Sequence, residues 1–263
     1  MIKEKKISIL ISTYNKCKFI KKTIRSCLNQ KYSNYEIIIV DTQSKDGTDK
    51  IINYFSHFKR ISFFKINRKY RNSPLNQIEA IKYGLSKAKG EIVCLLDGDD
   101  LFKQTKLREI NKFFQSNKAT NYVQDKISFT KNIIKENRTF LFFNILPNFF
   151  PTSTFSIRKK NLVLFLKKYS SNKFNLLEID ARLFFFSRLY KKDHSLLNKN
   201  LTVYRIDHSG ISSKFKKFSL EWFKKRIQAH VFLSKFFKNR SYPYLVDFFL
   251  SKLFFWLIKK FNL

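Results

Sequence analysis

The chain has 263 residues, enough for one large domain or two small ones, and its hydrophobic content of 44% excludes general disorder. Its 53 Lys and Arg residues outnumber 19 Asp and Glu residues, which gives a formal net charge of +34. Such an excess fits attraction to nucleic acids, anionic membranes or anionic substrates. The cations are nevertheless spread along the whole length among many Phe, Ile and Asn residues, so A/T-rich codon usage explains this composition without any partner.

Strands and helices alternate over the first hundred residues. Short apolar runs predict buried strands at 7–12, 35–40, 61–66 and 92–96. Apolar residues at helical spacing predict helices over 19–28, over 48–58 with Thr48 as the N-cap, and over 75–85. Repeated strand–helix units with almost continuously apolar strands predict a parallel α/β sheet between layers of helices.

The middle of the chain is less regular. Its pattern predicts a helix at 106–115, antiparallel strands within 121–137, a strand at 153–157, an amphipathic helix at 178–190 and a strand at 196–204. No internal repeat or low-complexity linker divides these elements. Residues 1–213 are therefore predicted to form one unit.

The last fifty residues differ in composition. Residues 214–263 carry 12 Lys and Arg residues against Glu221 and Asp247, a net charge of +10, together with fifteen aromatic residues. The most apolar piece, 245–258, has fourteen residues, whereas a membrane-spanning helix needs about 20 apolar residues. Two interpretations are open: amphipathic helices that lie on an anionic membrane surface, or helices that pack on the domain through their Phe faces.

Cysteine usage predicts a reducing compartment. Cys17, Cys27 and Cys94 lie in apolar, helix-like or strand-like contexts without CxxC spacing, and so resemble small buried hydrophobic residues. The apolar run near the N-terminus is too short for a signal peptide. We therefore expect a cytoplasmic protein, peripheral on the inner face of the cell membrane if the C-terminal segment binds lipid.

Three carboxylates follow the predicted strand at 92–96. Asp97, Asp99 and Asp100 flank Gly98 at its carboxyl end, where open α/β sheets bind ligands. Clustered carboxylates repel one another unless a cation joins them, which favours a hard divalent ion such as Mg²⁺ or Mn²⁺. A plain hairpin turn at Asp97-Gly98 is the alternative. An EF-hand loop is excluded, because its sixth and twelfth positions would hold Phe102 and Arg108.

Other polar groups end neighbouring strands of the predicted sheet. Ser12, Thr13, Tyr14 and Asn15 follow the first strand and Asp41 follows the second, so they are expected at the same edge as Asp97. The five glycines form neither GxGxxG nor GxxxxGK[ST]. A Rossmann dinucleotide site and a P-loop are therefore both unsupported.

Two segments resemble the family-2 glycosyltransferases with the GT-A fold: ISILISTYNKCKFIKKTIRSCLNQKYSNYEIIIVDTQSKDGT and EAIKYGLSKAKGEIVCLLDGDD. The similarity covers about the first hundred residues and continues more weakly to about 213. It implies a GT-A domain at 1–213, with a nucleotide-sugar-binding half at 1–100 and an acceptor-binding half at 101–213. Residues 214–263 would then be basic, amphipathic C-terminal helices.

The resemblance also implies a nucleotide-diphosphate-sugar donor, with a UDP-sugar preferred. By similarity, Ser12, Thr13, Tyr14, Asn15 and Asp41 would line the base and ribose pocket. Asp97 would face the ribose or the sugar, and Asp99 would be the main ligand of the Mg²⁺ or Mn²⁺ ion that bridges the diphosphate. For Asp41, an ordinary turn residue is the alternative.

An acidic motif falls where the family carries its catalytic base. By this similarity Asp180 is the candidate general base and Glu178 its substitute, since a carboxylate can accept the proton of an attacking hydroxyl. Alternatively, both acids only stabilise a helix N-terminus. Further along, the resemblance lets Arg205 or His208 reach the diphosphate from a closing loop.

Two departures from the family pattern leave the donor sugar and base open. Thr42 stands where many relatives have a second aspartate, and Lys82 stands where relatives often have Asn. The resemblance implies a metal-dependent, inverting sugar transferase for a cell-envelope glycan or a lipid-linked acceptor. The alternatives are transfer to a polyprenyl phosphate, a basic nucleic-acid-binding protein whose affinity falls steeply with salt, and a non-catalytic family member.

Overall fold

The computed structural model describes residues 4–129, 146, 151–191, 193–206, 215–236 and 242–261. Its first hundred residues contain four parallel strands: β1 (Ile7–Thr13), β2 (Tyr35–Asp41), β3 (Ile61–Lys65) and β4 (Ile92–Asp97). Three helices connect them: α1 (Cys17–Leu28), α2 (Thr48–Asn53) and α3 (Ser73–Lys87). The predicted alternation and the parallel sheet are confirmed for this half of the molecule.

Helix α2 differs from its prediction at both ends. Its N-cap is Gly47, whose φ of 87° lies in the left-handed region that favours glycine, so Thr48 is the first helical residue and not the cap. The Thr48 hydroxyl instead donates a hydrogen bond to the Asp46 carboxylate at 2.6 Å. The helix ends at Asn53, five residues before its predicted end, and Phe58 at that predicted end is exposed.

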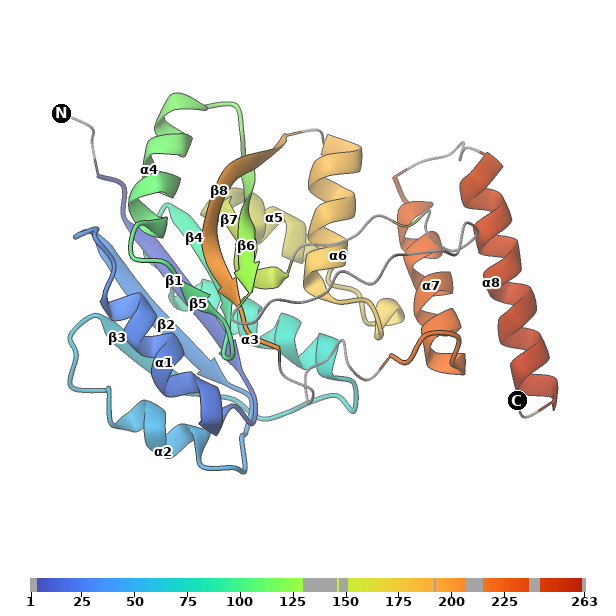
Figure 1. The fold of residues 1–263 in the computed structure, drawn as a ribbon, viewed down its shortest axis with the longest axis horizontal. Coiled ribbons are helices and arrows are strands. Elements are labelled where there is room, and N and C mark those ends of the chain that lie inside the picture. The colour runs from blue at the N-terminus through green and yellow to red at the C-terminus, as the bar shows by residue number, and fades with distance from the viewer. Residues whose placement is uncertain are drawn as a thin grey trace.

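The second half adds four strands and further helices. The strands are β5 (Leu101–Phe102), β6 (Tyr122–Phe129), β7 (Phe155–Arg158) and β8 (His194–Tyr204). The α-helices are α4 (Lys106–Ser116), α5 (Lys159–Tyr169) and α6 (Ile179–Phe184), and the short helices are η1 (Thr152–Thr154), η2 (Asn172–Phe174) and η3 (Phe185–Lys191). The eight strands of the described residues form one mixed sheet in the order β3-β2-β1-β4-β7-β6-β8-β5 (Figure 1).

Several predictions for this half need correction. Helix α5 was not predicted, and the helix expected over 178–190 becomes a π-helix from Phe185. Strand β6 is antiparallel to β7 but parallel to β8, while residues 130–137 of the expected strand region lie outside the described part. Strand β5 pairs with β8 and not with β4, so the hairpin interpretation of Asp97-Gly98 is wrong.

The sheet separates two apolar layers, as Figure 1 shows. Alternate residues of β1 face opposite sides: Leu10 packs with α3, α5 and α6, while Ile9 and Ile11 pack with α1, α2 and α4. Cys27 and Cys94 are buried in the second layer as predicted, whereas Cys17 is only half-buried. Because both faces are covered, the edges of the sheet are where polar chemistry can reach solvent.

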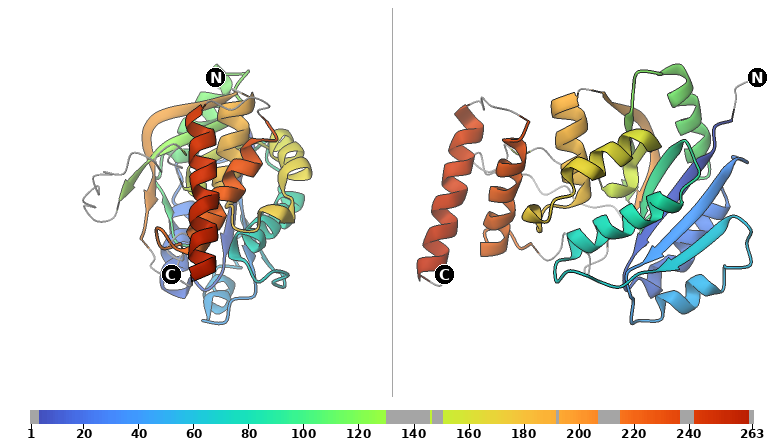
Figure 2. Two further views of the ribbon diagram at one scale, coloured as in Figure 1. Left: turned by 90° about the vertical axis from the view of Figure 1, so that its right-hand side faces the viewer. Right: turned by 180° about the vertical axis from the view of Figure 1, so that it is seen from behind.

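Two helices follow the sheet domain: α7 (Leu220–Leu233) and α8 (Tyr242–Phe261). Phe232 of α7 joins the core, with its ring centroid 5.1 Å from that of Phe174. Helix α8 lies against α7 on the side away from the sheet (Figure 2). Among the described residues, no helix combines the length and the apolar character needed to cross a bilayer.

Candidate active site

Strand register brings the predicted donor-side residues together. Ser12 of β1 is paired with Asp97 of β4, and Thr13 is paired with Asp41 of β2. The Ser12 hydroxyl donates a hydrogen bond to Asp97 Oδ1 at 3.3 Å. The carboxyl ends of three adjacent parallel strands therefore meet at one edge of the sheet, as the sequence predicted.

Asp97 is held at this edge by groups from other elements. Gln77 of α3 donates to Asp97 Oδ1 at 2.8 Å, and the Asp97 backbone N–H donates to the Ser153 hydroxyl at 3.0 Å. Burial, followed by the charge of Asp99, raises the pKa of Asp97 to about 7. The hydrogen bonds from Ser12 and Gln77 therefore fix the direction of this carboxyl, whose oxygens can accept a hydrogen bond from a sugar hydroxyl.

Residues 97–100 form an acidic turn at the end of β4, and Gly98 allows this acidic turn to lie directly against β1. A Cβ atom at this position would lie 2.5 Å from Thr13 Oγ1. The Gly98 backbone N–H donates to the Ser12 carbonyl at 3.0 Å, and its carbonyl accepts from the Thr23 hydroxyl at 2.9 Å. A larger residue would push the turn away from the strand end.

Asp99 is paired with a lysine that sequence reasoning missed. Lys16 Nζ lies 2.5 Å from Asp99 Oδ2, and the two side chains are 14% and 15% exposed. Lys16 stands at the N-cap of α1, where its backbone N–H donates to the Thr48 hydroxyl at 2.8 Å. The contact joins residues 83 positions apart in the sequence, so no local sequence pattern predicts it. A partly buried carboxylate thus already has one cation beside it.

The site fits a divalent cation that arrives with a phosphate ligand. Within the described residues, no group of three or more His, Cys, Asp and Glu side chains is arranged to hold a metal ion. Mg²⁺ commonly takes one or two carboxylates and completes its shell with substrate phosphates and water. Asp99 offers such a carboxylate, and Lys16 marks the place where positive charge is stabilised. The residues present therefore fit an ion bound jointly with a diphosphate.

Asp100 and Arg205 form a buried support under the acidic turn. Asp100 accepts hydrogen bonds from the Ser153 hydroxyl at 2.6 Å and from the Arg205 backbone N–H at 3.0 Å. The Arg205 guanidinium donates to the Asp99 carbonyl and, at 2.6 Å, to the Thr23 hydroxyl. Burial, followed by the charges of Asp99 and Asp97, raises the pKa of Asp100 to about 8. The Arg205 guanidinium is thus hydrogen-bonded beneath the turn, while His208 lies outside the described residues.

A second buried network continues from Ser153 into the core. The ammonium of Lys106 contacts Asp125 Oδ2 at 2.5 Å, the Ser153 carbonyl at 2.8 Å and the Thr202 hydroxyl at 2.8 Å. Lys106 and Asp125 are both fully buried. Because the pair is anchored to the residue that also holds the acidic turn, it fixes that turn relative to β6 and β8.

Asp41 is closed within its own turn. Both of its carboxylate oxygens accept hydrogen bonds from Ser44, one from the backbone N–H at 2.8 Å and one from the hydroxyl, and Asp41 is fully buried. The turn also holds the chain after β1, since the Asn15 backbone N–H donates to the Ser44 hydroxyl at 2.8 Å. Burial raises the pKa of Asp41 above its ordinary value. Asp41 therefore shapes the loops that end β1 and β2.

Tyr14 and Asn15 differ in how their side chains are used. The Arg68 guanidinium lies 3.9 Å from the centroid of the half-exposed Tyr14 ring. Asn15 has a φ of 50°, and its side-chain oxygen accepts from the Lys45 backbone N–H at 2.9 Å. Tyr14 and Arg68 thus offer a planar cationic surface, while Asn15 fixes the neighbouring loop.

Asp180 lies at the start of α6, where burial, and to a smaller extent the charge of Asp97, raises its pKa. Burial and then the charge of Glu178 raise the pKa of Asp180 to about 7, and the Asp97 charge acts in the same direction. Glu178 is paired with Lys225 of α7, with 2.5 Å between Oε1 and Nζ. Of the two acids, Asp180 is thus the one not committed to an ion pair with Lys225.

Arg182 holds the acidic motif in place. Its fully buried guanidinium donates to the carbonyls of Leu177, Tyr169, Ser171 and Phe174. This clamp ties α6 to the segment that ends α5 and forms η2. Arg182 follows Asp180 by two positions, but a charged residue on a predicted amphipathic helix gave no signal of burial.

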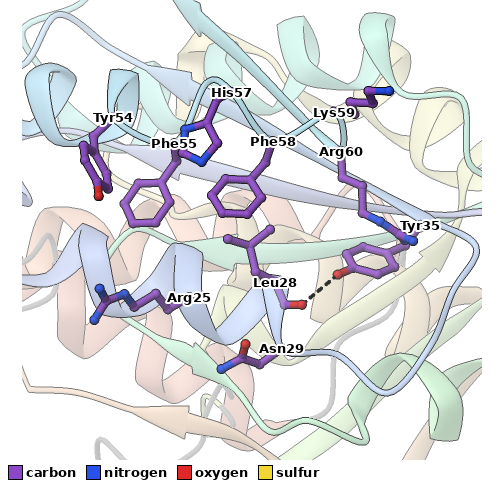
Figure 3. A pocket seen from close by; sticks show the side chains of 10 residues that line it. All are labelled: Arg25, Leu28, Asn29, Tyr35, Tyr54, Phe55, His57, Phe58, Lys59 and Arg60. Atoms are coloured by element: carbon purple, nitrogen blue, oxygen red, sulfur yellow. Dashed lines mark hydrogen bonds between the residues drawn. The ribbon is translucent and has the colours of Figure 1, made fainter.

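A well-formed cavity lies away from these acids. It has a volume of about 690 Å³ and is lined by residues from the end of α1, the start of β2 and the segment before β3, among them Arg25, Tyr54 and Arg60 (Figure 3). Strands β2 and β3 begin there, whereas the acidic turn follows the end of β4. The cavity is therefore at the opposite edge of the parallel sheet from the candidate site.

Comparison with known proteins agrees with the sequence motifs. Residues 8–180 match the family model described as Glycosyl transferase family 2. One curated relative is the GalNAc(5)-diNAcBac-PP-undecaprenol beta-1,3-glucosyltransferase of Campylobacter jejuni, 34% identical over 96 residues, which are 36% of this chain and 30% of the relative. The chain spans between 16% and 43% of the length of the curated relatives it matches.

Solved structures share the fold over almost the whole chain. The structure of S. aureus TarS residues 1–349 in complex with UDP-GlcNAc has a TM-score of 0.65 at 17% identity, and the match covers 94% of this chain and 72% of that TarS segment. The mannosyltransferase PcManGT from Pyrobaculum calidifontis, in complex with GDP-Man and Mn²⁺, has a TM-score of 0.60 at 13% identity, covering 96% of this chain and 70% of PcManGT. These likenesses confirm the GT-A fold, including a helical C-terminal extension.

Proposed function

The chain belongs to glycosyl transferase family 2, and we propose that it moves a sugar from a nucleotide-diphosphate donor to a hydroxyl group, with inversion at the anomeric carbon. The observation that carries this proposal is the grouping of polar and acidic side chains at one edge of the sheet. There Ser12, Asp97 and Asp99 meet, and Asp180 is near enough for its pKa to respond to Asp97. Such an arrangement provides a donor side and a base side for one displacement.

The donor is bound at the ends of β1, β2 and β4. In this proposal Ser12, Thr13, Tyr14 and Asn15 line the base and ribose pocket, and Asp97 hydrogen-bonds the ribose or the sugar. The fully buried Asp41 shapes the loops of that pocket through its hydrogen bonds to Ser44. A UDP-sugar is the preferred donor, supported by the UDP-GlcNAc complex of TarS, while the GDP-Man complex of PcManGT supports the wider nucleotide-sugar class.

Asp99 is the proposed protein ligand of a Mg²⁺ or Mn²⁺ ion. When bound, the ion supplies positive charge that stabilises the diphosphate as its negative charge grows. The Mn²⁺ in PcManGT, bound together with GDP-Man, supports a divalent ion as part of the donor complex. Lys16, already beside Asp99, provides a second positive group at the same place.

Asp180 is the proposed general base. The acceptor oxygen attacks the anomeric carbon, its proton passes to the Asp180 carboxylate, and the bond from that carbon to the diphosphate oxygen breaks. A pKa of about 7 is close to neutral pH, which favours both ionisation before attack and acceptance of the proton. Glu178 is the substitute base, but its pairing with Lys225 makes Asp180 the better candidate.

The proposed acceptor is a hydroxyl of a cell-envelope glycan or of a lipid-linked glycan. The Campylobacter relative supports a lipid-linked acceptor, since its name specifies a sugar chain on undecaprenol diphosphate. Transfer to a polyprenyl phosphate is the alternative within this class. We place the protein in the cytoplasm, peripheral on an anionic membrane face, where the basic C-terminal segment 214–263 meets lipid.

A nucleotide-sugar screen tests the proposal. The wild-type chain is expected to bind or hydrolyse one UDP-sugar in the presence of Mn²⁺ and to lose that signal with EDTA. Asp99→Ala should lose it as well, whereas the matched control Glu91→Ala, an exposed acid just before β4, should keep it. A signal that is independent of metal, or equal signals from wild type and Asp99→Ala, would contradict the assignment of Asp99 as a metal ligand.

A further inference from the structure

The outward face of α8 carries a continuous apolar stripe. Leu245, Phe249, Leu253 and Trp256 follow one another at helical spacing of four, four and three residues, and they are 37%, 63%, 49% and 52% exposed. Figure 2 shows α8 as the outermost helix, with α7 between it and the sheet domain. Four large side chains in line on one helix are more than the scattered exposed apolar residues of an ordinary surface.

The opposite face of α8 carries buried polar side chains and packs against α7. Asp247, the single acidic residue of this helix, is fully buried and accepts hydrogen bonds from Arg226 at 2.5 and 2.6 Å, and it contacts His230 Nε2 at 2.6 Å. The buried Ser251 lies one turn further along the same side. The helix is therefore anchored to α7 by this polar cluster and by Phe254, whose ring is stacked on Phe223 with 5.5 Å between the centroids. The exposed apolar stripe lies on the other side of the helix.

Lysines share the exposed face with the stripe. Lys252, Lys259 and Lys260 are all exposed, and Lys260 Nζ lies 4.8 Å from the Trp256 ring centroid. With Asp247 turned inward, the outer face of α8 carries these positive charges and no carboxylate. Lysine stems can lie along apolar surface while their ammonium groups reach a polar layer.

We propose that the outer face of α8 docks on an anionic lipid bilayer. Leu245, Phe249, Leu253 and Trp256 enter the boundary between head groups and acyl chains, and the three lysines contact lipid phosphates. A second copy of this face is a poorer occupant, because both copies would bring three lysines and no carboxylate to their interface. An anionic lipid surface matches both the apolar stripe and its charge.

Docking through α8 would place the bilayer on the side of the molecule where α7 meets the acidic motif. Helix α7 carries Arg226, which holds α8, and its neighbour Lys225, which pairs with Glu178 beside Asp180. Both α8 and α7 therefore lie between the docked face and the acidic motif. This consequence rests on the proposed function, since it favours an acceptor presented from the lipid, whereas the docking itself is measurable without any donor.

Vesicle binding of the full chain tests the proposal. Sedimentation with phosphatidylglycerol-containing vesicles should pull down the wild type, and pure phosphatidylcholine vesicles should bind it at least tenfold more weakly. The double variant Phe249→Ser, Trp256→Ser should lose at least about tenfold in affinity, because two exposed aromatic groups no longer enter the boundary. A matched double variant at the opposite edge of the sheet, Tyr54→Ser with Phe58→Ser, should bind as the wild type does.

Charge is tested separately from apolar contact. Replacing Lys252, Lys259 and Lys260 by Gln should weaken binding to anionic vesicles by about a hundredfold at low salt, at roughly fivefold per lysine. Replacement of three exposed lysines elsewhere, Lys50, Lys112 and Lys118, removes the same net charge and should have a much smaller effect. Equal losses from the two triple variants would overturn the proposal, because net charge alone would then explain binding.

Fluorescence reports directly on the docked face. The chain has two tryptophans, so Trp222→Phe leaves Trp256 as the sole emitter, and its emission should shift to the blue on anionic vesicles. No shift, no vesicle binding by the wild type, or a wild-type dimer that becomes a monomer in the Phe249→Ser, Trp256→Ser variant would each overturn the proposal. Donor hydrolysis measured without vesicles separates the two ideas, because it depends on Asp99 and not on α8.

Discussion

The donor side and the base side of this site are built in different ways. On the donor side, Ser12, Thr13, Asp41 and Asp97 come together through strand register alone, since each ends one of three adjacent parallel strands. On the base side, Asp180 depends on contacts between segments that share no sheet, above all the Arg182 clamp. A regular sheet positions residues that a sequence pattern can find, whereas the base side depends on buried side chains that the pattern does not reveal.

The largest effect is expected from the base itself. Asp180→Asn keeps the size of the side chain but removes its ability to accept a proton, so kcat should fall by about 10²–10⁴-fold. Donor binding, measured by calorimetry with the nucleotide sugar and Mn²⁺, should remain near the wild-type value because the donor side is unchanged. Near-normal turnover in this variant would remove Asp180 from the mechanism.

Loss of the clamp should unfold the base side. Arg182→Met leaves four carbonyl groups without their buried donor, so the free energy of unfolding should fall by about 3–5 kcal/mol. Thermal unfolding followed by circular dichroism measures this loss. The control is Arg25→Met on the exposed side of α1, which should change the unfolding temperature little. Similar unfolding temperatures for the two variants would contradict the clamp.

The pH dependence of transfer should follow Asp180. The base works only when ionised, and burial raises its pKa to about 7, so kcat/KM should fall about tenfold per pH unit below pH 7 and level off above it. An acid limb that stays flat down to pH 5 would speak against this assignment, because a carboxyl with an ordinary pKa remains ionised there.

Lys225 should influence the pH below which kcat/KM falls. Its positive charge lowers the pKa of Asp180, so Lys225→Met removes a lowering influence and should move the acid limb of kcat/KM toward higher pH. The pH–rate profiles of wild type and variant provide the comparison, with Lys224→Met, an exposed neighbour, as the control. A shift toward lower pH would have the wrong sign.

The smallest effect is expected on the donor side, at Lys16. Its ammonium competes with a metal ion for Asp99, so Lys16→Met should lower the Mn²⁺ concentration needed for half-maximal donor hydrolysis by a few-fold. The same variant should raise the KM for the donor, because the diphosphate loses a positive neighbour. Metal titration at fixed donor concentration checks the first expectation, and an unchanged midpoint would show that Lys16 and the ion do not compete.

Sequence alone predicted most of the parallel half because its signals are local. Apolar runs placed β1 to β4, and the polar residues after them fell at one edge. Helix α5 and the π-helix η3 were missed, since the first follows a strand without a break and the second continues a helical pattern with different hydrogen bonding. The N-cap of α2 was predicted one position too late, at Thr48, whereas the cap is Gly47.

Long-range contacts of the site had no signal in the sequence. Lys16 with Asp99 spans 83 positions, Arg205 with Asp99 spans 106, and Lys225 with Glu178 spans 47. Charged residues at such separations are indistinguishable from solvated surface groups in a chain this basic. The division of the chain at residue 213 remains a prediction, although α7, which follows it, supplies Lys225 to the acidic motif.

The fully buried Lys106–Asp125 pair limits which substitutions these two positions can tolerate during evolution. Exchange of one partner for an uncharged residue would strand the other charge in an apolar interior, whereas exchange of both for matching apolar residues would leave no stranded ion. The two positions are therefore expected to vary jointly among homologues, and a homologue that retained only one of the charges would need another counter-ion in its place.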